Sequence, residues 1–289
     1  MKVDLHIGPH RTATTWIQWA AHRNRDALAD RGILFINEPA QSNQVARALV
    51  REDADAALEE FDRLLDASLE RNGARHPAPS ALHSSEVFFE ANRRGLDAYG
   101  AAFRKFVDGL HFRGHEVRLV FVERSLEDRV VSNAMLQVSL GNLQYLSCDP
   151  TAFREYVEAN VWLKDFFFGG FDVAHLGFDD LSGEGDVFVN FLHLLYGMGF
   201  PEAAPPDAAV DARNGVSDLQ VARGLLLAPV LNWVELFGSV PRFELFNASM
   251  KLAAPVSDAS LAAIVSQVPM IRDCMRAMVR RAIEECIGA

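Results

Sequence analysis

Cysteine is scarce in this sequence, and its scarcity excludes several classes of protein. Three cysteines occur in 289 residues, Cys148, Cys274 and Cys286, and no two of them form a Cys-x-x-Cys pair. A disulfide framework or a cysteine-rich zinc module needs more cysteines at closer spacing. We therefore expect three buried thiols in a reduced protein.

Long apolar runs and an excess of positive charge are also missing. The chain has no stretch of about 18 uninterrupted apolar residues, and Asp4 and His6 interrupt the pattern that a secretory leader would need. The formal net charge is −11, with a pI near 5.3. A broad attraction to nucleic acid or to an anionic membrane is therefore not expected. We expect a cytoplasmic protein that has neither as a partner.

Short apolar runs that alternate with amphipathic segments dominate what is present. The strand-length runs lie at residues 3–7, 33–36, 80–83, 117–122 and 173–178. Helical periodicity is found at residues 14–28, 42–71 (in two pieces joined near Asp53), 99–110, 126–138, 151–168, 187–196, 219–237 and 258–285. This alternation predicts an α/β fold with a central, mostly parallel sheet flanked by helices. We expect a single domain over 1–289, with a helical C-terminal part, 206–289, packed on or over the sheet.

A polar loop joins the first predicted strand to the first predicted helix. It reads Gly8-Pro9-His10-Arg11-Thr12-Ala13-Thr14-Thr15-Trp16. Backbone N–H groups at the start of a helix and the helix dipole favour an anion, while hydroxyls and Arg11 add donors. It is not a Walker A loop, because Ala13 and Thr14 occupy the positions of its glycine and lysine. We predict phosphate binding, and the alternative is a polar turn with helix caps at Thr14 and Thr15.

A second polar segment follows the apolar run 117–122. Arg124 comes at the carboxyl end of this predicted strand, and Ser132 lies two turns along the next helix. Open α/β sheets bind ligands at the carboxyl ends of their strands. An arginine and a hydroxyl that converge there suit a second phosphate. The alternative is an ordinary turn with a surface arginine.

The string from His6 to Gln18 resembles the HIGxHKTGTTxLQ segment of bacterial sulfotransferases that use 3′-phosphoadenosine 5′-phosphosulfate (PAPS). The segment from Arg124 to Ser132 is similar to the 3′-phosphate motif of the same family. Two departures occur in the loop, where Arg11 replaces lysine and Ala13 replaces glycine. If Ala13 has a positive φ, its methyl group costs about 1 kcal/mol.

This resemblance implies a three-layer fold of the P-loop type and a set of site residues. The loop residues implied to hold the 5′-phosphosulfate are His10, Arg11, Thr12, Ala13, Thr14, Thr15 and Trp16. Arg124 and Ser132 are implied to hold the 3′-phosphate. Trp16 is expected to flank the adenine or the acceptor pocket. Arg213 is expected either to close over the nucleotide or to be an exposed loop residue.

The resemblance also implies a general base near the end of the third predicted strand. Glu86 occupies the expected position in Ser84-Ser85-Glu86, and His83 is the alternative base. A base must lie within hydrogen-bond reach of the acceptor hydroxyl. Ser84 replaces a lysine that some family members carry there.

The expected activity is transfer of a sulfuryl group from PAPS to a hydroxyl or amine of a small molecule or carbohydrate. Glu86 would accept the acceptor proton, Arg11 would stabilise charge on the leaving oxygen, and no metal is expected. Two alternatives stay open: a degenerate family member that binds nucleotide but turns over poorly, and a P-loop kinase of a small metabolite. The sequence leaves the acceptor and the oligomeric state open.

Overall fold

The computed structural model describes residues 1–9, 12–38, 43–72, 80–89, 95–139, 146, 151–200, 220–222, 225 and 263–287. The chain divides into two compact units. The first comprises residues 1–124 and 159–214, and the second comprises residues 125–158 and 215–289. Much of 206–289 lies outside the described residues, so the expectation of a single domain with a helical C-terminal part over the sheet stays a prediction.

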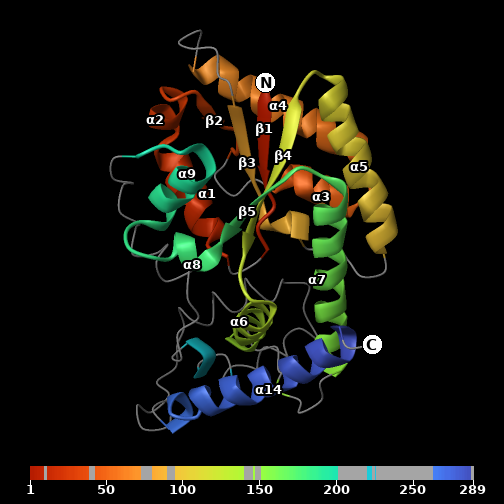
Figure 1. Ribbon diagram of the computed structural model, residues 1–289, viewed down its shortest axis with the longest axis vertical. Helices are drawn as coiled ribbons and strands as arrows, with labels where there is room; N and C mark the ends of the chain where they lie inside the picture. Colours follow the sequence, from red (N-terminus) through yellow and green to blue (C-terminus); the bar gives the residue numbers. More distant parts are fainter. Residues whose placement is uncertain are drawn as a thin grey trace, which may run out of the picture. The chain divides into compact units, whose positions relative to one another are not determined.

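A five-stranded parallel sheet forms the centre of the first unit (Figure 1). Its strands are β1 (Lys2–His6), β2 (Ile33–Phe35), β3 (Ser80–Ser84), β4 (Glu116–Glu123) and β5 (Val173–Gly177). They lie in the order β2-β3-β1-β4-β5, and each pair of neighbours is parallel. The predicted α/β class with a parallel sheet is therefore confirmed.

The apolar run of β4 is buried on both faces, as its continuous hydrophobicity predicts. Leu119 and Phe121 belong to one hydrophobic cluster and Val120 and Val122 to another, on the opposite face. Side chains alternate between the faces of a strand, so a strand covered on both sides needs apolar residues at every position.

Strand β1 departs from this pattern on one face. Val3, Leu5 and Ile7 enter the first cluster, but Asp4 points the other way and is fully buried. Its carboxylate accepts a hydrogen bond of 2.7 Å from Nε of Arg118, its register partner on β4. A buried carboxylate requires such a partner, because an unpaired charge is costly to bury.

Helices cover both faces of the sheet, which gives the first unit three layers (Figure 1). One face carries α1 (Thr14–Arg23), α2 (Arg25–Ala29), α8 (Phe178–Leu181) and α9 (Val187–Tyr196). The other carries α3 (Gln44–Val50), α4 (Ala54–Asn72), α5 (Leu96–Phe112) and the C-terminal part of α7 (Thr151–Gly170). The break between α3 and α4 falls at the predicted position near Asp53.

The connections leave the sheet toward opposite faces at its centre. From β1 the chain enters α1 and returns to β2, whereas from β3 it enters α5, on the other face, and returns to β4. Adjacent strands whose connections diverge in this way leave a crevice outside their carboxyl ends. The carboxyl ends of β1 and β3 are therefore where this topology favours a ligand.

The second unit is helical where it is described. It contains α6 (Leu126–Ser139), the first residues of α7, and α14 (Val268–Ile287). Arg276 contacts Glu127 at 3.3 Å and Asp128 at 2.9 Å, and Arg280 contacts Glu127 at 2.7 Å. These ion pairs join α14 to the first turn of α6.

The C-terminal region confirms one expectation in part and corrects another. Of the helix predicted at 258–285, residues 263–265 are helical, a turn follows at 266 and 267, and α14 spans Val268–Ile287, while 258–262 lie outside the described residues. Cys274 is exposed and Cys286 is partly exposed, so the expectation of buried thiols is wrong for Cys274. Cys148 and most of the helix predicted at 219–237 lie outside the described residues.

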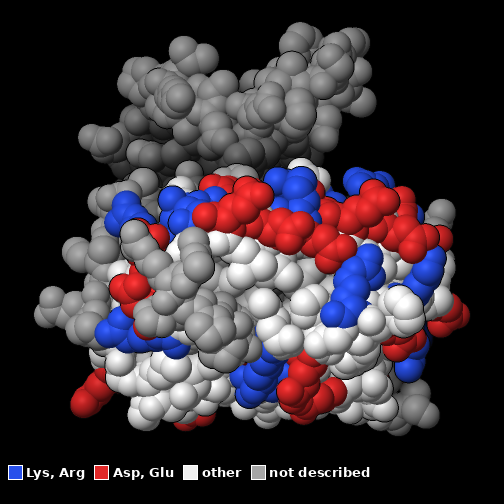
Figure 2. Space-filling view, turned by 90° about the horizontal axis from the view of Figure 1, so that it is seen from above, with Lys and Arg blue, Asp and Glu red and all other residues white. Residues whose placement is uncertain are grey.

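Acidic and basic side chains lie next to one another on the face seen in Figure 2. Ion pairs of this kind on the first unit include Lys105 with Asp55 at 2.7 Å and Arg113 with Asp62 at 3.0 Å. Among the helices that the structure describes, none has both the length and the apolar character required to cross a membrane.

Candidate functional site

Three neighbouring strands end in the polar segments singled out from the sequence. β1 runs into the loop that starts at Gly8, β3 is followed by Ser85 and Glu86, and β4 is followed by Arg124. β1 lies between β3 and β4 and is parallel to both. All three segments therefore lie at the same edge of the sheet, at the carboxyl ends of three adjacent strands.

The described part of the loop leads into α1 through a strained residue. Ala13 has φ 62° and ψ 12°, in the left-handed region, and is the N-cap of α1. No side chain of the described chain caps this helix, and its first turn contains no acidic residue. Thr14 and Thr15 are the first two helical residues, which corrects their expected role as caps. His10 and Arg11 lie outside the described residues.

The hydroxyls of Thr12 and Thr14 face each other in the interior of the loop. The Thr12 hydroxyl donates to the carbonyl of Pro9 at 2.6 Å, and the two Oγ1 atoms are 3.3 Å apart. Both residues are buried, whereas Thr15 is partly exposed. Since the Thr12 proton is engaged, the Thr14 hydroxyl is the donor in the long contact with Thr12, and an anion in the loop would compete with Thr12 for that proton.

Gly8 lies where polar side chains approach the loop backbone. A Cβ atom on Gly8 would lie 2.6 Å from His6 Nε2, 2.8 Å from Thr14 Oγ1 and 3.1 Å from Thr12 Oγ1. Real Cβ atoms essentially never come closer than 3.0 Å to a neighbour. The absence of a side chain therefore lets the histidine and the two hydroxyls pack directly against the loop.

A buried polar network joins the ends of β1, β2 and β3. His6 Nδ1 is 2.8 Å from the hydroxyl of Ser84, its register partner. The side-chain amide of Asn37 accepts from the Ser84 N–H at 2.9 Å and donates to the Ser84 carbonyl at 2.7 Å. Gln18, on α1, donates to the same carbonyl at 2.9 Å. The network fixes Ser84, two residues before Glu86.

Sequence reasoning did not assign this network. His6 and Gln18 stand in the string that carries the family resemblance, but neither was given a role. Asn37 directly follows the apolar run predicted as a strand at 33–36, so a polar residue at a strand end was the signal that could have found it.

Glu86 opens a short 3₁₀ helix, Glu86–Phe89, and is partly exposed. Ser85 fixes the start of this turn, because its hydroxyl donates to Asn43 Oδ1 at 2.6 Å and accepts from the Val87 N–H at 3.2 Å. The backbone directly before Glu86 is therefore held in place by hydrogen bonds.

His83, the alternative base, points to the other face of the sheet. It is fully buried, and its ring packs edge-on against Phe61 and Phe88. Burial lowers the pKa of His83 to about 4. Neither ring nitrogen has a hydrogen-bond partner among the residues that the structure describes. The His83 ring is thus enclosed by phenylalanine side chains, and one of them, Phe88, comes from the 3₁₀ helix that Glu86 opens.

The remaining predicted residues have different surroundings. The Arg124 guanidinium lies over the ring of Phe178, 5.0 Å from its centroid. Trp16 is buried in the cluster beneath α1 and is 7% exposed, so its role toward a nucleotide stays a prediction. Ser132 lies in the second turn of α6, which belongs to the second unit, and its pairing with Arg124 stays a prediction. Arg213 lies outside the described residues.

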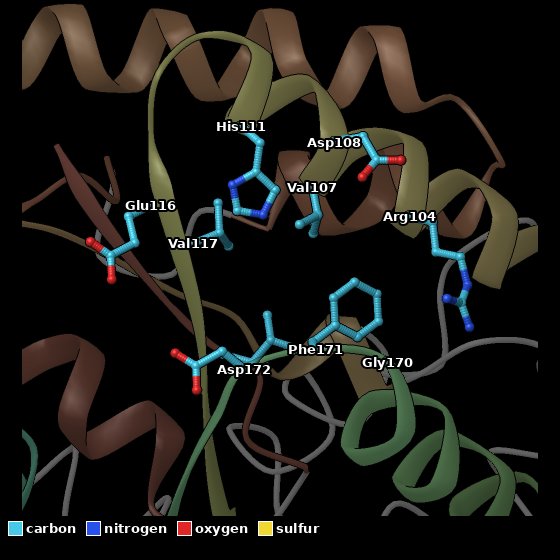
Figure 3. Close-up of a pocket in the computed structure, with 10 residues that line it drawn as sticks. Arg104, Val107, Asp108, His111, Glu116, Val117, Gly170, Phe171 and Asp172 are labelled. Atoms are coloured by element: carbon cyan, nitrogen blue, oxygen red, sulfur yellow. The ribbon is translucent and has the colours of Figure 1, made fainter.

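A cavity of about 450 Å³ lies elsewhere in the first unit. Figure 3 shows the rings of His111 and Phe171 at this cavity, with Arg104 at one side and Glu116 at the other. It lies at the amino end of β4, whereas the loop follows the carboxyl end of β1, so it is separate from the candidate site. Within the described residues, no group of three or more His, Cys, Asp or Glu side chains is placed to hold a metal ion.

Comparisons with known proteins add no assignment. No protein-family model matches the chain, no curated protein matches it, and no solved structure matches it.

Proposed function

We propose that the chain is a PAPS-dependent sulfotransferase with a fold of the P-loop type, which acts on a hydroxyl or amine of a small molecule or carbohydrate. The carboxyl edge of the sheet carries the proposal, since the loop, Glu86 and Arg124 follow three adjacent parallel strands there. The loop string that resembles the family lies at the strand-to-helix junction that anion binding requires.

The residues present fit the phosphosulfate end of such a donor. The N-terminus of α1 has no side-chain cap within the described chain, so its first N–H groups are suited to bind an anion. The Thr14 hydroxyl adds a donor, and Gly8 leaves the loop backbone close to it. PAPS would supply the sulfuryl group and leave as adenosine 3′,5′-bisphosphate.

The other groups take the roles that the family resemblance implies. Glu86, partly exposed after the anchored Ser85, would accept the proton of the acceptor. Arg124 would hold the 3′-phosphate together with Ser132. Arg11 would stabilise charge on the leaving oxygen.

A transfer assay with sulfur-labelled PAPS and a panel of phenols, sugars and amines tests this proposal. We expect label transfer to at least one acceptor. Glu86→Gln should lower the transfer rate by about 100-fold or more, because the base is removed. Its affinity for adenosine 3′,5′-bisphosphate should stay within about twofold. Glu59→Gln, at an exposed position on α4, is the matched control and should leave the rate unchanged.

One observation favours a second candidate, a family member that binds the nucleotide but turns over poorly. Ala13 adopts φ 62°, where the family has glycine, so the loop carries strain that the family loop lacks. Nucleotide binding without transfer to any acceptor would support this candidate. Arg11→Lys combined with Ala13→Gly should then raise the transfer rate, and an unchanged rate would count against it.

A further inference from the structure

His6 occupies an unusual position between the loop and β3. It is fully buried at the last residue of β1, with its ring against Phe191 of α9. Nδ1 bonds to the Ser84 hydroxyl on β3 at 2.8 Å. Nε2 faces the loop, because a Cβ atom on Gly8 would lie 2.6 Å from Nε2 and 2.8 Å from Thr14 Oγ1. Nε2 has no hydrogen-bond partner among the described residues.

The network around Ser84 selects one tautomer of His6. Within the described chain, the buried Ser84 hydroxyl is hydrogen-bonded to His6 Nδ1. If Nδ1 carried the proton, the Ser84 proton and the Nε2 lone pair would both be buried without partners. If Ser84 donates to Nδ1, the Nε2–H group alone is unsatisfied. Because each buried unsatisfied group is costly, the second arrangement is favoured.

We propose that His6 is a positioning residue of the anion loop. Its Nδ1 accepts a hydrogen bond from the Ser84 hydroxyl, and its Nε2–H donates a hydrogen bond to the Thr14 hydroxyl when the loop holds an anion. In the unliganded loop the Thr14 proton points to the Thr12 oxygen at 3.3 Å, because the Thr12 proton is held by Pro9. Once the Thr14 oxygen accepts the bond from Nε2–H, its own proton turns from this long contact toward the anion. His6 thereby ties the loop to the strand that leads to Glu86. The inference rests on the anion-binding role of the loop in the proposed function.

The imidazole performs this role without a charge. Burial lowers the pKa of His6 to about 3, so the ring is neutral near pH 7. A neutral histidine has one donor and one acceptor, which are the two groups that Thr14 and Ser84 require.

Nitrogen-15 NMR of the histidine side chains in the unliganded full-length protein tests the tautomer directly. The His6 signal, assigned by its loss in His6→Gln, should show a protonated Nε2 and an unprotonated Nδ1 at pH 7. Ser84→Ala should shift the population toward the other tautomer, because the donor to Nδ1 is removed. A protonated Nδ1 in the wild-type protein would overturn the proposal.

Two substitutions separate the roles of the ring nitrogens. Glutamine keeps an amide donor near the position of Nε2, whereas asparagine keeps its amide only near the position of Nδ1. Both substitutions remove the ring that contacts Phe191. With inorganic pyrophosphate and adenosine 3′,5′-bisphosphate as calorimetric probes, His6→Gln should bind within about threefold of wild type. His6→Asn should bind about tenfold more weakly, which corresponds to about 1.4 kcal/mol.

The outcomes distinguish this inference from the proposed function. Equal affinities for the two variants would overturn the role of Nε2–H, even if PAPS transfer is observed. Binding that follows the expected order without any transfer would support the role of His6 and contradict the sulfotransferase proposal. A wild-type protein that binds neither probe would overturn both.

Discussion

Replacing Ala13 by glycine should stabilise the protein, although it deletes a methyl group. Ala13 is held at φ 62° and ψ 12° where the loop enters α1. For an L-residue this left-handed conformation places Cβ too close to the neighbouring carbonyl oxygen, whereas glycine has no Cβ and adopts it freely.

The magnitude follows from three opposing contributions. Relief of the left-handed conformation is worth about 1–2 kcal/mol. The greater freedom of glycine in the unfolded chain offsets about 0.4–1 kcal/mol of this. The Ala13 methyl packs partly against the cluster beneath α1, so its loss costs less than the roughly 0.8 kcal/mol of a fully buried group. We expect a net gain of about 0.5 kcal/mol in the free energy of unfolding.

Equilibrium urea unfolding measures this difference, and two other positions calibrate it. Glu52 also has a positive φ, 65°, but is exposed and away from the loop, so Glu52→Gly should stabilise the protein by a similar or larger amount. Ala67 lies in the interior of α4, where glycine should cost about 1 kcal/mol. Of the three variants, Ala13→Gly alone should change the affinity for adenosine 3′,5′-bisphosphate.

Loss of stability in Ala13→Gly comparable to that of Ala67→Gly would refute the reasoning. It would mean that the backbone at position 13 does not hold the left-handed conformation in solution. If Glu52→Gly gains stability and Ala13→Gly does not, the Ala13 methyl group contributes more packing free energy than assumed.

Three further predictions concern acid stability, loop packing and thiol exposure. The pKa values of His6 and His83 are lowered by burial to about 3 and about 4, below the unfolded value near 6.5. The neutral forms therefore contribute stability above about pH 6.5 that is lost as the pH falls, by about 2 kcal/mol each at pH 5. Urea unfolding should show this loss, and His83→Leu should remove about half of it; a loss unchanged in that variant would contradict the assignment. Gly8→Ala should destabilise by about 1–3 kcal/mol because its Cβ would lie 2.6 Å from His6 Nε2, whereas Gly199→Ala, in open space, should stay within about 0.5 kcal/mol. Cys274 is exposed, so a thiol reagent should modify it in the native protein, and protection until urea is added would show that its surface is covered.

Strands β2 and β4 were predictable because each contains a short apolar run that the sheet buries, whereas β5, at the edge of the sheet, buries only Leu176. β4 was expected at 117–122 and spans Glu116–Glu123, and α9 was expected at 187–196 and spans Val187–Tyr196. The break near Asp53 was visible because apolar periodicity stops and restarts there. Local signals of this kind depend only on neighbouring residues.

The polar contacts that shape the site were not predictable in the same way. Asn37 bonds to Ser84 across 47 positions, and Gln18 reaches the same residue across 66 positions. Only the register of the sheet brings these residues together. The left-handed φ of Ala13 was stated as a condition and is found, but the fully buried state of His6 depends on the helix that covers its face.

Competition between nucleotides tests most directly whether one ligand is held at the ends of both β1 and β4. We predict that the wild-type protein binds adenosine 3′,5′-bisphosphate at least about tenfold more tightly than AMP, a difference of about 1.4 kcal/mol. Arg124→Ala should abolish this preference, while Arg51→Ala, at an exposed position after α3, should retain it. Equal affinity of the wild-type protein for the two nucleotides, or a preference that survives in Arg124→Ala, would contradict the account.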